Sequence, residues 1–124
     1  MLFRSDGIEP ILVADTPRPA GSVPACLADH RSDVQTCTVT VDTGRVAELD
    51  GWLRTATAEQ AVGFVEPTAW LCIEGRCPTV LGDLLVYRDD NHLSDHAATW
   101  LEPLLDASIG DWVDRFVAAR EARR

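Results

Sequence analysis

The order of three segments in the first half of the chain constrains its fold most strongly. An apolar run at residues 8–14 is followed by a proline-rich stretch, which is typical of a buried strand that ends in a turn, because proline cannot continue a central ladder. A helical period of apolar residues begins at Val46, and a second short apolar run begins at Gly63. Strand, helix, strand is the order that right-handed parallel crossovers produce. The sequence therefore predicts an α/β fold with a parallel sheet layer.

The helical period places one apolar stripe on a single amphipathic helix, which we expect to pack on the sheet. The stripe comprises Val46, Leu49, Leu53, Ala56 and Gln60, with Trp52 at its edge. The tryptophans at 52, 70, 100 and 112 lie on or beside apolar stripes, which favours core packing over sugar stacking. Upstream of the helix, prolines at 17, 19 and 24 predict an extended segment.

A second helix is predicted after Ser94, a suitable N-cap ahead of a further apolar period. Pro103 is expected to kink or divide this helix, because proline lacks the backbone donor, and Gly110 is expected to end it. Residues 107–124 then form an additional C-terminal helix. Ahead of Ser94, the apolar residues 79–87 are interrupted by glycine and aspartate, which predicts a short hairpin or a bent extended segment.

Length and charge exclude two classes of protein. The 20 acidic against 11 basic side chains give a net charge of -9, so we expect no nucleic acid partner. No apolar run approaches the roughly 20 residues that span a bilayer, and the first residues lack the apolar region of a signal peptide, so the chain itself is expected to carry no targeting signal. A chain of 124 residues can bury one core, and we interpret residues 1–124 as one domain or part of one.

The four cysteines form two sequence-local pairs. Cys72 and Cys77 flank a loop that contains a glycine, and Cys26 and Cys37 bracket a polar segment, so two local disulfides are our first choice among three pairings. A zinc site and free thiols are the alternatives, although neither pair has the usual Cys-x-x-Cys spacing and His30 is the only histidine among the cysteines. Disulfides would indicate an oxidising compartment outside the cytoplasm, and an export or membrane segment would then belong to a longer parent chain.

Asp89 and His92 form an Asp-x-x-His unit between an apolar segment and the start of a helix. A carboxylate and an imidazole at this spacing are suited to hold a general base, as in hydrolases. The alternative is a loop carboxylate that caps a turn beside a surface histidine. Asn91 is either a solvated turn residue or a contact to substrate. His96 lies four residues after His92, but no third ligand is placed to complete a metal site, so we expect no metal and no cofactor.

Several blocks resemble the C-terminal part of SGNH hydrolase-like domains, in particular those fused to acyltransferase 3 membrane proteins. The blocks are Cys72-x4-Cys77-Pro78, Gly82, Tyr87-Arg-Asp-Asp-Asn-His-Leu-Ser94, Ala97 with Leu101, and, upstream, Asp15-Thr-Pro-Arg-Pro with Val23-Pro-x-Cys26-Leu27. Together they cover most of residues 10–106, whereas residues 107–124 have no such support.

The resemblance implies a three-layer α/β/α sandwich with a parallel, flavodoxin-like sheet, of which this chain holds the C-terminal portion. It implies a location outside the cytoplasmic membrane and an acyl-ester or glycan substrate, because such domains move or remove acyl groups, commonly acetyl, on bacterial cell-surface glycans. His92 would be the catalytic base and Asp89 the carboxylate that orients it. The partners would be the N-terminal half of the domain and a membrane acyltransferase domain of the same parent chain.

The serine that such a base serves is not recognisable in the sequence. The family carries it in a Gly-Asp-Ser block, and the nearest formal match, Ser5-Asp6-Gly7, has the wrong order and no strand before it. A base without a nucleophile has nothing to activate. We therefore expect the C-terminal portion of an O-acyltransferase or acetylesterase domain that is inactive alone. The alternative is a non-catalytic extracytoplasmic module that binds glycan or protein.

Overall fold

The computed structural model describes residues 7–41 and 45–124. The elements in chain order are β1 (Ile11–Val13), α2 (Val23–Asp29), η1 (Val34–Cys37), β2 (Val39–Thr40), α3 (Arg45–Glu59), β3 (Gly63–Val65), α4 (Thr68–Leu71), β4 (Arg76–Cys77), β5 (Val80–Leu81), β6 (Leu84–Leu85) and α5 (Asp95–Glu121). β1 pairs with β3, β2 with β4, and β5 with β6, each as a two-stranded sheet within the described residues. The fold is α/β, as the sequence predicts.

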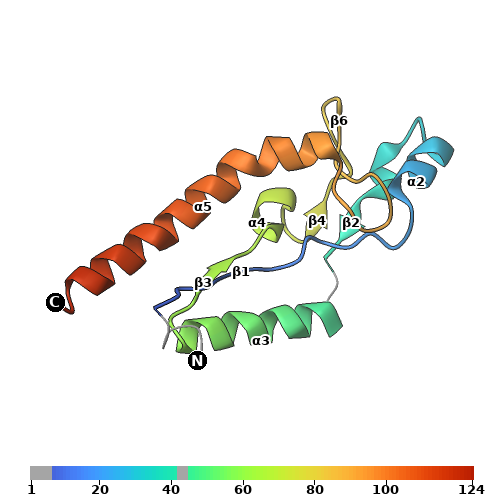
Figure 1. Cartoon of the computed structure of the whole chain (residues 1–124). Coiled ribbons are helices and arrows are strands. Elements are labelled where there is room, and N and C mark those ends of the chain that lie inside the picture. The colour runs from blue at the N-terminus through green and yellow to red at the C-terminus, as the bar shows by residue number, and fades with distance from the viewer. Residues whose placement is uncertain (1–6, 42–44) are drawn as a thin grey trace.

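The predicted parallel layer is formed by β1 and β3, which pair in parallel with Leu12 opposite Phe64. Helix α3 lies on one side of this strand pair, and the long helix α5 crosses its other side (Figure 1). The β2–β4 and β5–β6 pairs are antiparallel. The β5–β6 pair is the predicted hairpin, and its turn holds Gly82 at a φ of 63°, a left-handed conformation that glycine adopts without strain.

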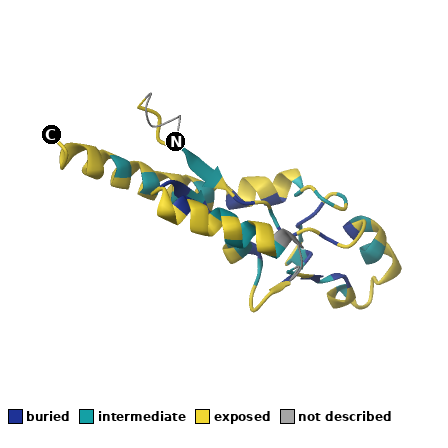
Figure 2. Ribbon diagram, turned by 90° about the horizontal axis from the view of Figure 1, so that it is seen from below, coloured by how far each residue is buried: buried dark blue, intermediate teal, exposed yellow. Residues whose placement is uncertain are grey.

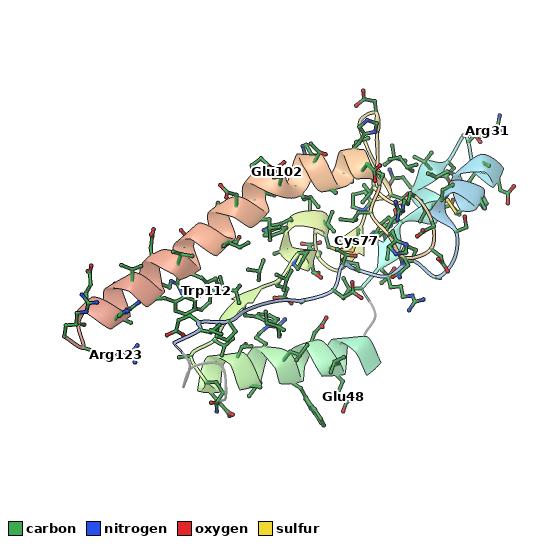
Figure 3. The ribbon with its side chains drawn as sticks, in the orientation of Figure 1. Arg31, Glu48, Cys77, Glu102, Trp112 and Arg123 are labelled. Atoms are coloured by element: carbon green, nitrogen blue, oxygen red, sulfur yellow. A yellow bond between two sulfur atoms is a disulfide. The ribbon has the colours of Figure 1, made fainter. Side chains whose placement is uncertain are left out.

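Trp112 joins α5 to the outer edge of β3. Its side chain points from the helix toward the strand (Figure 3), and its Nε1 donates a hydrogen bond of 3.1 Å to the carbonyl oxygen of Phe64. Two side chains pack tightly around Gly63, because a Cβ atom there would lie 2.9 Å from Ile11 Cγ1 of β1 and 3.1 Å from the Trp112 indole ring of α5. A larger residue at this position would force Ile11 or Trp112 to move, so glycine fits best where α5 crosses β3.

The hydrophobic core lies at the end of the molecule that holds the β2–β4 and β5–β6 pairs and the start of α5. The C-terminal half of α5 is largely exposed (Figure 2). The buried members of the core are Val23, Val39, Leu71, Cys77, Val86, Tyr87 and Leu101. Tyr87 has no exposed surface, and its hydroxyl donates a 2.7 Å hydrogen bond to the carbonyl oxygen of Pro17. This bond satisfies the polar group that burial of a tyrosine brings into a core.

The segment predicted to be extended contains helix α2 instead. Ser22 caps this helix, with its Oγ accepting a hydrogen bond from the Ala25 N–H at 3.3 Å. Pro24 lies in the first turn, where backbone N–H groups have no acceptor within the helix, so proline loses no hydrogen bond there. The prediction was wrong because proline excludes a helix interior but favours a helix start.

Helix α5 runs without interruption through Pro103 and Gly110. Residues 107–124 are therefore the continuation of this helix and its last residues, and the expectation of a separate C-terminal helix was wrong. Both residues face solvent, so water can satisfy the carbonyl that Pro103 leaves without a donor. Leu101 on one side and Trp112 on the other pack against the rest of the molecule and hold the helix in place.

The stripe predicted to face the sheet lies mostly on the outside of α3. Trp52 is 71% exposed, Leu49 is also exposed, and Thr57 is the buried residue of the described part of this helix. The Thr57 hydroxyl is satisfied by the carbonyl oxygens of Leu53 and Arg54, at 2.8 and 3.0 Å, which allows a polar residue on the buried side. Ala56 and Gln60 are also exposed, and the side chain of Val46 lies outside the described residues.

Candidate functional site

The candidate site lies on a loop of residues 88–93 that closes on itself between the hairpin and α5. At its base Tyr87 and Leu93 form an isolated antiparallel bridge, and the N–H of Arg88 donates to the carbonyl oxygen of His92 at 3.0 Å. Just outside this bridge, the N–H of Ser94 donates to the carbonyl oxygen of Val86 at 2.8 Å. Both ends of the loop are therefore held to the core.

Within the loop, one carboxylate holds both the turn and the imidazole. Asp89 Oδ1 accepts hydrogen bonds from the backbone N–H groups of Asn91 and His92, at 2.7 and 2.6 Å. Asp89 Oδ2 lies 2.8 Å from His92 Nδ1. Asp89 thus caps a turn and also orients the histidine ring, and the role of His92 as a catalytic base stays a prediction.

These hydrogen bonds determine the protonation of the pair. The backbone N–H of His92, the backbone N–H of Asn91 and the His92 side chain lower the pKa of Asp89 from 3.8 to about 2. Asp89 is therefore ionised at neutral pH and only accepts hydrogen bonds, so Nδ1 of His92 must carry the proton that is shared with Oδ2. In the neutral ring this leaves Nε2 without a proton and able to accept one.

The imidazole faces outward. The His92 side chain is 58% exposed and that of Asp89 41%. Nε2 of His92 has no hydrogen-bond partner among residues 7–41 and 45–124. This nitrogen is therefore accessible to a reacting group that approaches from outside the described part of the chain.

The serine nearest in sequence to His92 is occupied by a structural role. Ser94 has the extended backbone of an N-cap, and its Oγ accepts a hydrogen bond from the Ala97 N–H at 3.0 Å while donating one to the carbonyl oxygen of Leu85. Ser94 thus begins α5, as predicted, and ties its first turn to the hairpin. Ser5 and Asp6 of the nearest Gly-Asp-Ser-like match lie outside the described residues.

Two contacts behind the loop were not foreseen from the sequence. The N–H of Val23 donates to the carbonyl oxygen of Asp89 at 3.4 Å, and the hydroxyl of Tyr87 holds Pro17. Burial, with a smaller contribution from Asp15, raises the pKa of Tyr87 to about 12, so its hydroxyl stays a donor. Residues 15–23 therefore support the loop from beneath, and the position of Tyr87 immediately before the Arg-Asp-Asp-Asn-His run was the available signal.

The other polar side chains of the loop make few or only weak interactions with the rest of the chain. Arg88 approaches Asp89 at 3.9 Å and Asp95 at 3.7 Å, exposed ion pairs that contribute little stability. The side-chain amide of Asn91 makes no hydrogen bond to the described residues, and its contact with substrate stays a prediction. Across the described chain, no group of three or more His, Cys, Asp or Glu side chains is arranged to hold a metal ion.

The two predicted disulfides are confirmed. Cys26 and Cys37 are bonded with their Cα atoms 5.9 Å apart, which joins α2 to η1, and Cys72 and Cys77 are bonded with their Cα atoms 4.1 Å apart. Cys77 is buried in the core, directly before the residues that lead into the hairpin. The zinc and free-thiol alternatives are therefore wrong for these four residues.

Comparison with known proteins identifies one family. Residues 2–107 match the family model described as SGNH domain (fused to AT3 domains), which covers more than half of the chain. No curated protein and no solved structure matches the chain. In the part of the chain that the structure describes, no helix combines the length and the apolar character needed to cross a membrane.

Proposed function

The chain belongs to the family of SGNH domains that are fused to AT3 domains, and we propose that it supplies the histidine and carboxylate of an acyl-ester site. The observation that carries this proposal is the geometry of the pair, with Asp89 Oδ2 at 2.8 Å from His92 Nδ1 and the imidazole side chain 58% exposed. A base held in one tautomer by a carboxylate is the arrangement that activates a serine in acyl transfer. The serine and the donors for the oxyanion come from polypeptide outside these 124 residues.

In this site, Nε2 of His92 takes the proton of the serine hydroxyl while the hydroxyl oxygen bonds to the carbonyl carbon of the ester. Asp89 stabilises the imidazolium that forms, since its carboxylate is ionised at neutral pH. The imidazolium then gives its proton to the leaving alkoxide as the ester C–O bond breaks. Water or a sugar hydroxyl accepts the acyl group from serine through the same proton transfers, which gives hydrolysis or transfer.

Among the described residues, β1 pairs only with β3, and its other edge supports the addition of further strands. Hydrogen bonds from Gly63 N–H to Pro10 O and from Ala14 N–H to Val65 O join β1 to β3. Because backbone groups alternate in direction along a strand, those of Ile11 and Val13 point away from β3, toward the free edge of β1. The opposite edge, on β3, is covered by Trp112. We place the remaining strands of a three-layer α/β/α, flavodoxin-like sandwich along β1, with residues 1–124 as the C-terminal portion of that single domain.

We place the domain outside the cytoplasm, joined in its parent chain to a membrane acyltransferase domain. The two disulfides support this location, because such bonds persist in oxidising compartments. The fusion of the family to AT3 domains supports the membrane partner. The substrate class that fits both is an acyl ester, commonly an acetyl ester, on a cell-surface glycan.

Hydrolysis of a chromogenic acetyl ester tests the proposal. This chain alone should give no turnover above the uncatalysed rate. The parent domain, which adds the serine block, should turn the ester over. His92→Ala in the parent domain should lower that rate at least about a hundredfold. His30→Ala, at an exposed histidine that follows α2, is the matched control and should keep the rate. A parent domain that retains full turnover after His92→Ala would overturn the assignment of the base.

A non-catalytic extracytoplasmic module that binds glycan or protein is the second candidate. Trp100 favours it, since its side chain is half exposed instead of packed in the core. The same assay separates the two functions, because a parent domain without turnover at any pH between 6 and 9 would support the second.

A further inference from the structure

A cavity lies between the β5–β6 hairpin and the first two turns of α5, the helix that follows the loop of the candidate site. Its volume is about 450 Å³, within the range of small-molecule sites. The residues that line it are Leu81, Asp83, Leu84, His96, Thr99 and Trp100. It takes none of its lining from the loop of residues 88–93, so it is separate from the Asp89–His92 pair.

One wall of this cavity is an exposed aromatic ring. The sequence predicts that Trp100 packs in the core, but the residue is 51% exposed. Leu81 and Leu84 of the hairpin, both half-buried, continue the apolar surface. A large amphipathic ring held on a rigid helix beside other apolar side chains is a favourable surface for a flat apolar ligand face.

The rim of the cavity carries polar groups that can hydrogen-bond to a ligand. The carboxylate of Asp83 and the imidazole of His96 make no hydrogen bond or ion pair with the described residues. Thr99 Oγ1 donates to the carbonyl oxygen of Asp95 at 2.9 Å, so its lone pairs can still accept a hydrogen bond. Acceptors and a donor therefore surround the aromatic face.

We propose that this cavity binds a sugar ring of a glycan. The C–H face of the ring stacks on Trp100, and its hydroxyl groups hydrogen-bond to Asp83 and His96. A sugar combines an apolar face with a rim of neutral hydroxyls, which matches this wall and this rim. The carboxylate of Asp83 and the net charge of -9 disfavour a phosphate or another anion.

The position of the cavity links it to the candidate site. Trp100 follows the N-cap Ser94 by six residues, which is about 9 Å along the helix axis at 1.5 Å per residue. A glycan with one ring on Trp100 would therefore bind on the first turns of the helix that follows the loop of residues 88–93. The identification of this glycan as the substrate rests on the proposed function, whereas the binding itself requires neither serine nor turnover.

Titration of this chain with soluble oligosaccharides of glucose, galactose, rhamnose and N-acetylglucosamine tests the proposal by calorimetry. At least one of these probes should bind, and Trp100→Ala should weaken that binding about tenfold or more. Trp100→Phe, which keeps an aromatic face, should restore part of the affinity. Trp52→Ala is the matched control, because Trp52 is 71% exposed on α3 and does not line the cavity, and it should bind like the unmodified chain.

Circular dichroism of each variant verifies that the helices are retained. The proposal would be overturned if none of the four probes bound, or if Trp100→Ala bound with unchanged affinity. An equal loss of affinity in the Trp52→Ala control would also overturn it. So would self-association that depends on Trp100 in place of sugar binding. His92→Ala should bind sugar normally. Loss of sugar binding in a parent domain that still cleaves a small acetyl ester contradicts only the sugar site. Normal sugar binding without any ester turnover contradicts only the proposed function.

Discussion

Asp89 Oδ2 lies 2.8 Å from His92 Nδ1, while Oδ1 of the same carboxylate accepts the backbone N–H groups of Asn91 and His92. One side chain therefore builds the turn and orients the ring that the turn presents. The two roles are coupled, because any movement of the carboxylate shifts both the backbone of His92 and its imidazole. This coupling makes the geometry of the pair sensitive to the charge of Asp89.

Stability should depend on pH through Asp89. Its pKa is lowered from 3.8 to about 2 in the folded chain, so its contribution is present above pH 3.8 and is lost as the pH falls toward 2. The unfolding free energy of the unmodified chain should thus fall more steeply between pH 4 and 2 than that of Asp89→Asn. Urea unfolding at a series of pH values measures both slopes, and Asp90→Asn, in the same loop, is the control. Equal slopes for the chain and Asp89→Asn would count against the hydrogen bonds described for this carboxylate.

Gly63→Ala should destabilise the fold. The new Cβ would lie 2.9 Å from Ile11 Cγ1 and 3.1 Å from the Trp112 ring, and such overpacking costs about 1–3 kcal/mol. Gly51→Ala on α3 is the matched control, since its Cβ meets no atom within 4 Å and a helical alanine gains about 1 kcal/mol over glycine. Chemical denaturation should therefore move the two midpoints in opposite directions. A Gly63→Ala chain as stable as the unmodified chain would contradict the tight packing of Ile11 and Trp112 around residue 63.

Ser94→Ala should cost about 1–2 kcal/mol, because it removes the N-cap of α5 together with the bond from Ser94 Oγ to the Leu85 carbonyl. Ser94→Thr should recover most of the loss. Thermal unfolding followed at a helical wavelength measures the difference. Ser108→Ala, within α5, provides the control, and a loss no larger than in this control would rule out the capping role.

The two disulfides should differ in their contribution. The Cys26–Cys37 bond closes the longer loop, with a sequence separation of 11 against 5 for Cys72–Cys77, and a loop of this length corresponds to about 3 kcal/mol of chain entropy. The Cys26→Ala/Cys37→Ala variant should therefore lower the unfolding free energy by about that amount. Mass spectrometry before and after reduction gives the number of bonds directly. An intact mass that reduction does not change would contradict both bonds.

The features that follow from local chemistry were predicted correctly from the sequence. The hairpin turn at Gly82, the cap at Ser94 and the two cysteine pairs depend on residues close together in the chain. The parallel pairing of β1 with β3 joins distant residues, but the order strand, helix, strand predicted it. Helix α2 was missed although a signal was present, because Ser22 followed by Pro24 is also a typical helix start.

The features that depend on distant contacts were not predictable in the same way. The helical period in α3 does not by itself decide which face is buried, and Thr57 can lie inside because its hydroxyl bonds to backbone carbonyls. Likewise, α5 passes Pro103 because Leu101 and Trp112 pack on either side of it, which only the fold reveals. At the site, the Asp-x-x-His spacing predicted the pair, whereas the support from Tyr87 and Val23 came from segments far away in the sequence.

The rate at which a fluorophosphonate labels the serine of the parent domain tests the role of His92 most directly. This reagent reports activation of the nucleophile without a requirement for any particular glycan. The account predicts covalent labelling of a single serine outside residues 1–124, slowed at least about a hundredfold by His92→Ala and also slowed by Asp89→Asn. Labelling that proceeds at the same rate in the domain with His92→Ala would contradict the assignment of this histidine as the base.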